Sequence, residues 1–334
     1  LVHAAVVGVG WILGGTDNLG GLIGVWLLAF SALLLVWVML RTIYAVWRLR
    51  HRIEGSVRPP RGLATLVGRP VPAPDGVRER LHVEWREGLT ADLTTPARHD
   101  CRLPVVVYVH GGGWTSGDPQ RQARDLYHEL ALAGWAVLAI RYPLAPHVGV
   151  EHQVEVVRAA VRWTRADLAE HGVEATHVVL AGGSAGAHLA STAALTAEHP
   201  SERVEACVAL YGIFDMANRN RTRAPWGIIP NTVMQATVAQ APNRYRDLSP
   251  LDRITDSSPP FLVVHGTRDT LVPVGEAEQF VAALREANRP VEFVPVVGAQ
   301  HAFDALSSPT TRATAAVIRT WLHRRVATGA APRT

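Results

Sequence analysis

The sequence predicts an α/β fold, in which a mainly parallel sheet carries helices on both faces. Apolar runs of strand length recur along the chain, and their continuity is typical of strands that are buried on both faces. Segments with apolar residues at helical spacing lie between these runs, and such alternation indicates a mainly parallel sheet. Strands are expected at residues 104–109, 135–140, 204–211, 261–265 and 291–297, and in the run that begins at Val178.

The N-terminal part is expected to hold a transmembrane helix. Residues 22–40 carry no charged side chain and are long enough to cross a bilayer, which takes roughly 20 apolar residues. A core helix would have a polar face, and this run has none. A shorter apolar run at 2–13 precedes it, so the anchor is either one helix or a helical hairpin.

Four arginines directly after the apolar run indicate the orientation in the membrane. They are Arg41, Arg48, Arg50 and Arg52. By the positive-inside rule, this bias places the following chain on the cytoplasmic side of the cell membrane.

The chain is expected to divide into three parts. Residues 1–50 form the membrane anchor, and residues 51–100 form a proline-containing linker with an edge or cap segment. The stretch 80–85 is expected to be an edge strand within that segment. Residues 101–334 form the α/β domain.

Helices are expected between the strands of this domain. Apolar spacing predicts helices at 150–161, 274–288 and 310–326. Asp118 is a suitable N-cap, because proline follows it at the first helical position. Residues 212–254 break the alternation as an insertion, which is either a lid over the strand ends or a plain surface excursion.

Composition excludes several classes of protein. The net charge is only +4, and no basic stretch interleaved with aromatic residues indicates nucleic-acid binding. The two cysteines, Cys101 and Cys207, lack the spacing of a metal site or a disulfide framework, so no metal site is expected.

The most informative motif is Gly182-Gly-Ser-Ala-Gly186. An apolar run leads into it and a run of small residues with helical character follows, which is the pattern of a nucleophile elbow. The glycines let the backbone pass close to the strand and the helix. The N–H groups at the start of the helix favour negative charge that develops at Ser184.

Two further strand-end motifs supply the partners that a serine nucleophile needs. Asp269 follows one later strand and His301 follows the last, so the order is serine, aspartate, histidine, as in α/β-hydrolases. His301 is expected to take the proton of Ser184, and Asp269 is expected to hold the imidazole in the correct tautomer.

The same strand ends supply an oxyanion hole. A tetrahedral intermediate carries an oxyanion that needs preorganised N–H donors. Backbone N–H groups of Gly112, Gly113 and Ala185 are expected to provide them, and the glycines leave room for the substrate.

The motifs together resemble those of the hormone-sensitive-lipase-like esterases, and more narrowly the membrane-anchored actinobacterial lipases and esterases of that group. The resemblance covers residues 105–326 and implies an α/β-hydrolase fold, carboxylic ester hydrolysis and no cofactor. The chain departs from the family at Gly183, where many relatives have an acidic residue, and at Pro143, where many have arginine. The matching motifs are His110-Gly-Gly-Gly-Trp, Tyr142-Pro-Leu-Ala-Pro, Ala181-Gly-Gly-Ser-Ala-Gly, His265-Gly-Thr-Arg-Asp and Gln300-His-Ala-Phe-Asp.

Other residues near these motifs have plainer expected roles. His188 is expected to pack in the core, and His110 to orient the glycine loop. Asp215 is the second choice for the acid, and Asp304 is expected to cap a helix near His301. Trp114 and Trp226 are expected either to line the acyl pocket as substrate-binding residues or to belong to the core.

The sequence therefore predicts a membrane-tethered serine esterase that acts on small-molecule or lipid esters of short to medium acyl length. Two alternatives remain at this point. The same site can attack an amide or formamide, and a catalytically silent membrane-bound interaction module can share the fold.

Overall fold

The computed structural model describes residues 19–55 and 72–327, and the chain forms two compact units, Leu1–Arg48 and Leu49–Thr334. The first unit contributes one described helix, α2 (Leu19–Arg50). The apolar run at 2–13 lies outside the described residues.

Helix α2 exposes apolar side chains along its length. Trp26, Phe30 and Leu33 are each more than 60% exposed. Its segment Leu22–Arg50 has the length and composition of a membrane-crossing helix, and its apolar window is not buried. Among the described residues it is the one helix of this kind, and a signal sequence has the same features.

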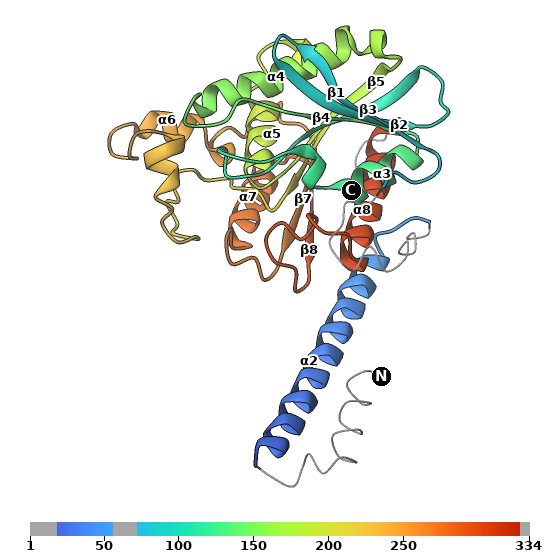
Figure 1. Cartoon of the computed structure of the whole chain (residues 1–334). Helices are drawn as coiled ribbons and strands as arrows, with labels where there is room; N and C mark the ends of the chain where they lie inside the picture. The colour runs from blue at the N-terminus through green and yellow to red at the C-terminus, as the bar shows by residue number, and fades with distance from the viewer. Residues whose placement is uncertain (1–18, 56–71, 328–334) are drawn as a thin grey trace. The chain divides into compact units, whose positions relative to one another are not determined.

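The second unit is built on an eight-stranded sheet in the described part of the chain, with the order β1-β2-β4-β3-β5-β6-β7-β8 (Figure 1). The strand pairs β1–β2 and β2–β4 are antiparallel, and the pairs from β4 to β8 are parallel. The strands are β1 (Val77–Arg86), β2 (Leu89–Pro96), β3 (Arg102–Val109), β4 (Ala136–Ile140), β5 (Glu174–Gly183), β6 (Ala206–Leu210), β7 (Phe261–Gly266) and β8 (Val291–Val296).

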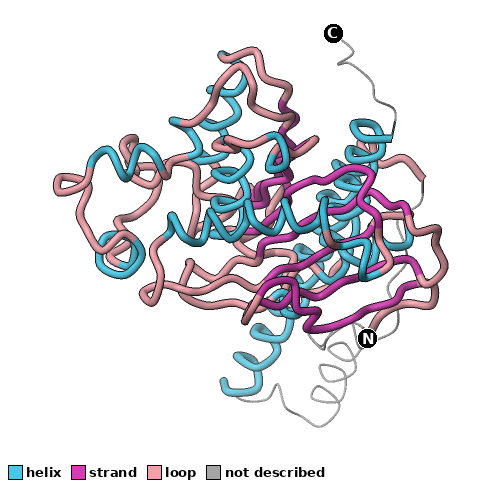
Figure 2. Tube along the Cα trace, turned by 90° about the horizontal axis from the view of Figure 1, so that it is seen from above, coloured by secondary structure: helices cyan, strands magenta, loops and turns pink. Residues whose placement is uncertain are grey.

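Helices cover both faces of this sheet, as Figure 1 shows, and Figure 2 shows the strands as one twisted layer between them. Helix α3 packs on α8, and α4 packs on α5. The helices are α3 (Arg124–Leu132), α4 (Val150–Ala166), α5 (Ala185–Leu195), α6 (Pro242–Asp247), α7 (Gly275–Glu286) and α8 (Pro309–Leu322).

Burial on both faces explains the composition of the central strands. Every residue from Val105 to Val109 is buried, as is every residue of β4 and β6. Strands in such a sheet have no solvent-facing side, so they read as continuous apolar runs. The predicted mainly parallel α/β fold is confirmed, and the stretch 80–85 lies within the outermost strand, β1.

The structure confirms one expected N-cap, Asp118, and shows that the other, Asp304, is wrong. Asp118 caps the short 3₁₀ turn Pro119–Arg121, where its Oδ1 accepts from the N–H of Gln120 at 2.8 Å, and α3 begins later. Asp304 is not an N-cap, because α8 begins at Pro309 and Ser308 caps it by accepting from the N–H of Thr311 at 3.0 Å.

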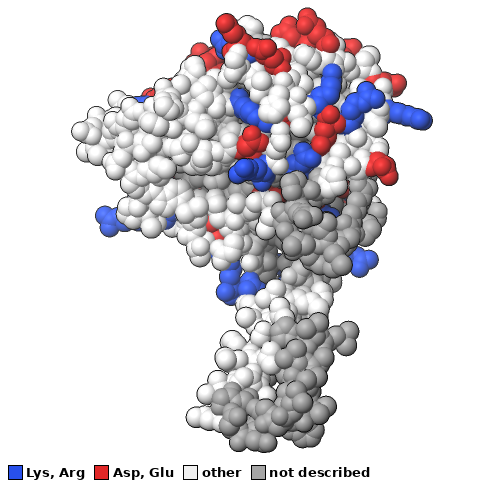
Figure 3. Space-filling model, viewed as in Figure 1, with Lys and Arg blue, Asp and Glu red and all other residues white. Residues whose placement is uncertain are grey.

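The insertion 212–254 lies between β6 and β7, and Figure 1 shows it at one side of the unit. It holds the π-helical turn Ile229–Val233, helix α6 and the 3₁₀ turn Pro250–Asp252. Elsewhere on the unit, Figure 3 shows acidic and basic residues interspersed on the face in view. Ion pairs such as Arg162–Glu202 join charges of opposite sign in this unit.

Candidate active site

Ser184 lies at the sharp turn between β5 and α5. Its backbone has φ 55° and ψ −121°, a combination that residues with a side chain rarely adopt. The flanking glycines make the turn possible. A Cβ on Gly186 would lie 2.0 Å from the carbonyl oxygen of Val109, and one on Gly182 would lie 2.4 Å from the oxygen of Gly186. The local sequence is therefore dictated by close backbone packing.

Three strand-end loops bring Ser184, His301 and Asp269 together. The Nε2 atom of His301 lies 2.9 Å from the Oγ of Ser184, and its Nδ1 atom lies 2.7 Å from Oδ2 of Asp269. In this arrangement the serine hydroxyl donates to Nε2 while Nδ1–H donates to the carboxylate. The three residues follow β5, β8 and β7, whose carboxyl ends lie at the same edge of the parallel sheet.

The carboxyl of Asp269 is held as an anion. Its Oδ1 accepts from the backbone N–H groups of Leu271 and Val272, at 3.0 and 2.8 Å. Burial raises its pKa, but hydrogen bonds from His265 and His301, together with the charge of His301 and the N–H of Val272, outweigh burial and bring the pKa to about 2. Asp269 is therefore ionised at neutral pH.

The glycine loop after β3 lies directly against the elbow. A Cβ on Gly111 would lie 2.7 Å from the oxygen of Gly183 and 3.2 Å from the Cβ of Ser184. Gly112 and Gly113 have φ values of 133° and 61°, which favour glycine. Ala185 is the first residue of α5, so its N–H has no carbonyl partner within the helix.

Buried hydrogen bonds support the glycine loop. The Nε1–H of Trp114 donates to Nδ1 of His188 at 3.1 Å, and Nε2 of His188 lies 2.7 Å from the oxygen of Leu248. Because Nδ1 accepts, the proton of the imidazole is on Nε2. Burial lowers the pKa of His188 to about 4, so the ring is neutral at pH 7.

Trp114 is fully enclosed, with 0% of its surface exposed. Its peptide oxygen accepts from the N–H of Ala145 and from Nε2 of Gln153, at 2.9 and 3.0 Å. These contacts make it a core residue that supports the loop, so a substrate has no direct access to its indole. His110 stacks on Tyr142 beside the same loop, with ring centroids 4.4 Å apart.

The insertion reaches the glycine loop. The Cδ1 atom of Ile228 lies 4.0 Å from the place where a Cβ on Gly113 would be, and Ile228 is 39% exposed. Trp226 is partly buried against the core. No sequence pattern singled out Ile228, because its position depends on how the insertion folds back.

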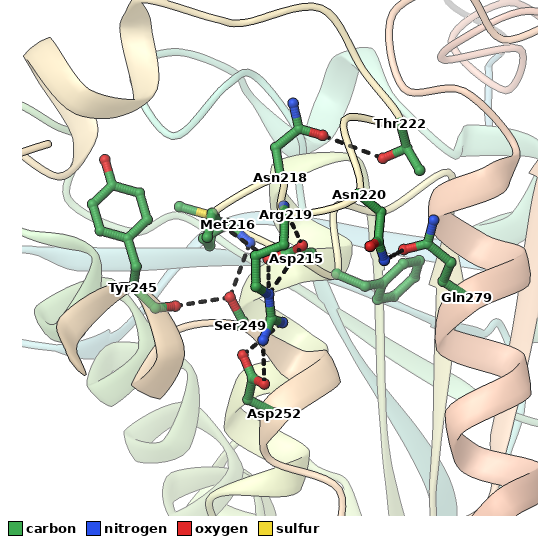
Figure 4. Close-up of polar contacts among 12 residues, drawn as sticks. Asp215, Met216, Asn218, Arg219, Asn220, Thr222, Tyr245, Ser249, Asp252 and Gln279 are labelled. Carbon is green, nitrogen blue, oxygen red and sulfur yellow. Dashed lines mark hydrogen bonds and ion pairs between the residues drawn. The ribbon is translucent and has the colours of Figure 1, made fainter. Parts of the chain in front are cut away.

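Asp215 is not the partner of His301. Its carboxylate accepts from the backbone N–H groups of Ala217 and Arg219, at 3.1 and 2.8 Å, and pairs with the side chain of Arg219. Figure 4 shows Arg219 reaching on to Asp252, at 2.8 Å. This cluster fixes the base of the insertion.

The structure also explains the departure at Gly183. A Cβ there would lie 2.5 Å from the Oη of Tyr211, which fills the space beside the residue before the nucleophile. Sequence reasoning missed Tyr211.

Among residues 19–55 and 72–327, no group of three or more His, Cys, Asp or Glu side chains has the arrangement of a metal site.

The sequence model of the BD-FAE family matches residues 91–284, which is more than half of the chain. The chain is 36% identical over 234 residues to esterase LipC of Mycobacterium tuberculosis, covering 66% of this chain and 58% of LipC. It is 35% identical over 260 residues to a probable carboxylic ester hydrolase, LipM, of the same organism, covering 73% of this chain and 58% of LipM. The chain thus spans about three fifths of the length of these curated relatives.

Solved structures agree on the fold. A thermophilic esterase from Thermogutta terrifontis superposes with a TM-score of 0.60 at 26% identity, covering 78% of this chain and 95% of that one. A truncated carbohydrate esterase from gut microbiota superposes with a TM-score of 0.66 at 19% identity, covering 75% of this chain and 99% of that one, which bears on the fold alone. The expected resemblance to α/β-hydrolase esterases is confirmed.

Proposed function

The chain belongs to the BD-FAE family, and on that premise we propose that it is a serine esterase that hydrolyses carboxylic esters through an acyl-enzyme. One observation carries the proposal: the imidazole of His301 bridges the hydroxyl of Ser184 and the carboxylate of Asp269. The relatives LipC, an esterase, and LipM, a probable carboxylic ester hydrolase, support the same reaction class.

In the first step, Oγ of Ser184 attacks the ester carbonyl carbon while Nε2 of His301 takes the hydroxyl proton. Asp269, ionised and buried, stabilises the imidazolium that forms and keeps the ring in its tautomer. The tetrahedral intermediate collapses as Nε2–H gives its proton to the departing alkoxide, which leaves as an alcohol. The acyl group is then esterified to Ser184.

In the second step, His301 takes a proton from water, and the hydroxide equivalent attacks the acyl carbon. Collapse returns the proton to Oγ of Ser184 and releases the carboxylic acid. Both tetrahedral intermediates place negative charge beside Gly112, Gly113 and Ala185. Their N–H groups are the proposed oxyanion hole, and the glycine loop lies against Ser184 as that role requires.

The proposed substrates are small-molecule or lipid esters with acyl chains of short to medium length. Ile228 lies close to Gly113 and brings an apolar side chain over the oxyanion loop, which supports a small apolar pocket. Trp226 remains a proposed wall of that pocket on the insertion side. Trp114 is left out of the proposal, because its indole is fully enclosed.

We further propose that α2 tethers the enzyme to the cell membrane with the catalytic unit on the cytoplasmic side. The length and composition of Leu22–Arg50 support the tether. The arginines that follow the apolar run support the orientation.

A covalent label tests the proposed nucleophile. A fluorophosphonate should modify Ser184 in the wild-type chain, and mass spectrometry of the peptide that contains Gly182–Gly186 would locate the label. Labelling should weaken at acidic pH, because a protonated His301 cannot accept the serine proton. Ser184→Ala should abolish labelling and reduce hydrolysis of a p-nitrophenyl ester to the small residue due to binding and the oxyanion hole.

Ser191→Ala is the matched control, because Ser191 lies on the same helix, buried and away from His301. It should keep both labelling and hydrolysis. An unlabelled Ser184 in folded wild-type protein at pH 8 would sink the proposal in favour of a silent interaction module. Faster turnover of a matched amide than of the ester would replace the esterase by an amide hydrolase.

A further inference from the structure

Behind His301 lies a buried pair of polar side chains that the mechanism above does not use. The hydroxyl of Tyr211 donates to Oδ1 of Asp304. Tyr211 is 0% exposed and Asp304 is 7% exposed. Tyr211 follows β6, and Asp304 lies three positions after His301 on the loop that follows β8. The pair therefore joins the histidine loop to the centre of the sheet.

The pair touches the catalytic imidazole and the elbow at once. The ring of Tyr211 meets that of His301 edge to face, with centroids 5.0 Å apart at 67°. On its other side the phenol fills the space next to Gly183, where a Cβ would lie 2.5 Å from Oη. Tyr211 thus lies between the residue before the nucleophile and the general base.

The arrangement is costly for the folded state. The φ of Tyr211 is +41°, a left-handed conformation that is a genuine outlier for a bulky residue. Within the described part of the chain, Oδ2 of Asp304 is buried without a hydrogen-bond partner. Strained backbone and a half-satisfied buried carboxyl oppose stability, and such features cluster at functional sites.

Other contacts hold the two ends of the histidine loop. At its start, the N–H of Gly298 donates to Oγ1 of Thr267 at 2.9 Å, which connects the His301 loop to the loop that carries Asp269. At its end, Oγ1 of Thr311 donates to the oxygen of Phe303 at 2.9 Å. Directly after Phe303, the contact of Asp304 with Tyr211 connects the loop to the residue that follows β6. The position of the His301 ring therefore depends on contacts with the loop of Asp269 and with Tyr211, which follows β6.

We propose that Asp304 is a positioning residue for ester hydrolysis, which acts through Tyr211 to hold the imidazole of His301 at hydrogen-bond distance from Ser184. This inference rests on the proposed esterase function. It adds a second carboxyl to the site, one that touches no substrate and acts on the base through the ring of Tyr211.

The environment of Asp304 also couples the pair to pH. The groups that face it are Tyr211 after β6, Tyr108 on β3, Tyr127 and Asp125 on α3, and His301 on its own loop. Burial raises the pKa of Asp304 to about 6, although the hydrogen bond from Tyr211 lowers it. Above that pH, the ionised carboxylate of Asp304 stabilises the protonated imidazole of His301. Its charge should therefore move the acid limb of the pH–activity profile to higher pH.

Tyr211→Phe tests the tether. It removes the hydroxyl and keeps the ring that packs on His301. We expect kcat for a p-nitrophenyl ester, counted per fluorophosphonate-labelled site, to fall about tenfold, because small misplacements of a base are expensive. KM should stay within about twofold, because the pair does not contact substrate. Asp304→Ala should give the same split, and the double variant should be no slower than the slower single one.

Asp304→Asn keeps an acceptor for Tyr211 but cannot ionise. It should retain most of kcat, while the midpoint of the acid limb of kcat/KM moves to lower pH by about half a unit. Tyr127→Phe is the matched control. It removes another buried phenol hydroxyl nearby, one that has no hydrogen-bond partner among the described residues, and should leave kcat within about twofold.

Expressing kcat per fluorophosphonate-labelled site distinguishes a failure of this proposal from a failure of the esterase function on which it rests. If the wild type neither labels nor turns over esters, the esterase function fails. If the wild type is active and Tyr211→Phe and Asp304→Ala keep kcat per site within twofold, the positioning role is overturned. An unmoved acid limb in Asp304→Asn would also count against it. A lower melting temperature with unchanged kcat per site would make Asp304 a structural residue only.

Discussion

At the scale of single residues, the two aspartates at the strand ends differ in what they contact. Asp269 binds His301 at 2.7 Å, whereas Asp215 binds Arg219 and the backbone of the insertion. Asp269→Asn should keep the fold but lower kcat by about 10⁴, because the amide cannot hold the tautomer that accepts the serine proton. Asp215→Asn should lower kcat far less. Ester hydrolysis by the two purified variants measures both.

The outcome is decided by the ratio of the two effects. Circular dichroism and melting curves establish that each variant is folded. A larger loss of turnover in Asp215→Asn than in folded Asp269→Asn would contradict the assignment of the acid.

Sequence motifs sufficed to bring together Ser184, Asp269 and His301, because each follows a buried strand and parallel strands end at one edge of the sheet. Tyr211 and Asp304 could not be paired in this way. They are 93 positions apart, and neither stands in a motif that predicts a hydrogen bond between them. Asp304 resembled a helix cap because a helical pattern follows, but Ser308, directly before Pro309, takes that position.

At the scale of elements, the insertion 212–254 depends on one buried acid of α7. The carboxylate of Glu276 accepts from the N–H of Phe214 at 3.2 Å and from Oγ1 of Thr222 at 2.8 Å, and it pairs with Arg223. The side chains of Arg223 and Glu276 are only 2% and 1% exposed. The first part of the insertion is therefore attached to the core through this carboxylate.

Removing the charge of Glu276 should be expensive. Glu276→Gln leaves the guanidinium of Arg223 buried without its counter-ion, and breaking a buried pair in this way costs about 3–5 kcal/mol. We expect a loss of unfolding free energy of that order in urea titrations, and faster proteolysis within 212–254. Arg253→Gln is the control, because the pair Arg253–Asp247 is 41% and 59% exposed and should contribute less than about 1 kcal/mol.

An unchanged unfolding midpoint in Glu276→Gln would contradict this account of the insertion. The sequence did not predict that Glu276 attaches the insertion to the core, because the contacts join residues about 50 to 60 positions apart and follow no periodic sequence pattern. The strands were easier to predict, because burial on both faces leaves a continuous apolar run in the sequence itself.

At the scale of the whole molecule, α2 carries the features of a membrane boundary near residue 40. The uncharged run 22–40 would span about 28 Å as a helix, close to the hydrocarbon core of a bilayer at about 30 Å. Directly after it, Arg41 lies over the ring of Trp37, 4.5 Å from its centroid, and Tyr44 stacks on Trp47. Aromatic and basic side chains of this kind favour the interface between lipid and water.

The proposed tether and its orientation can be tested in intact cells. The full chain should stay in the membrane fraction after an alkaline carbonate wash. Arginine at both Leu33 and Leu34 should release it, because each charge at the centre of the span costs about 2.5–3.5 kcal/mol. The same double change at Thr42 and Ile43, beyond the apolar run, is the control for added charge and should leave the chain in the membrane fraction, because Ile43 is 57% exposed. A reporter that is active only in the cytoplasm, fused at the C-terminus, should be active, because the arginines after residue 40 favour that side. An exported reporter signal from the same position would reverse the orientation, and a processed chain in the soluble fraction would make α2 a signal sequence.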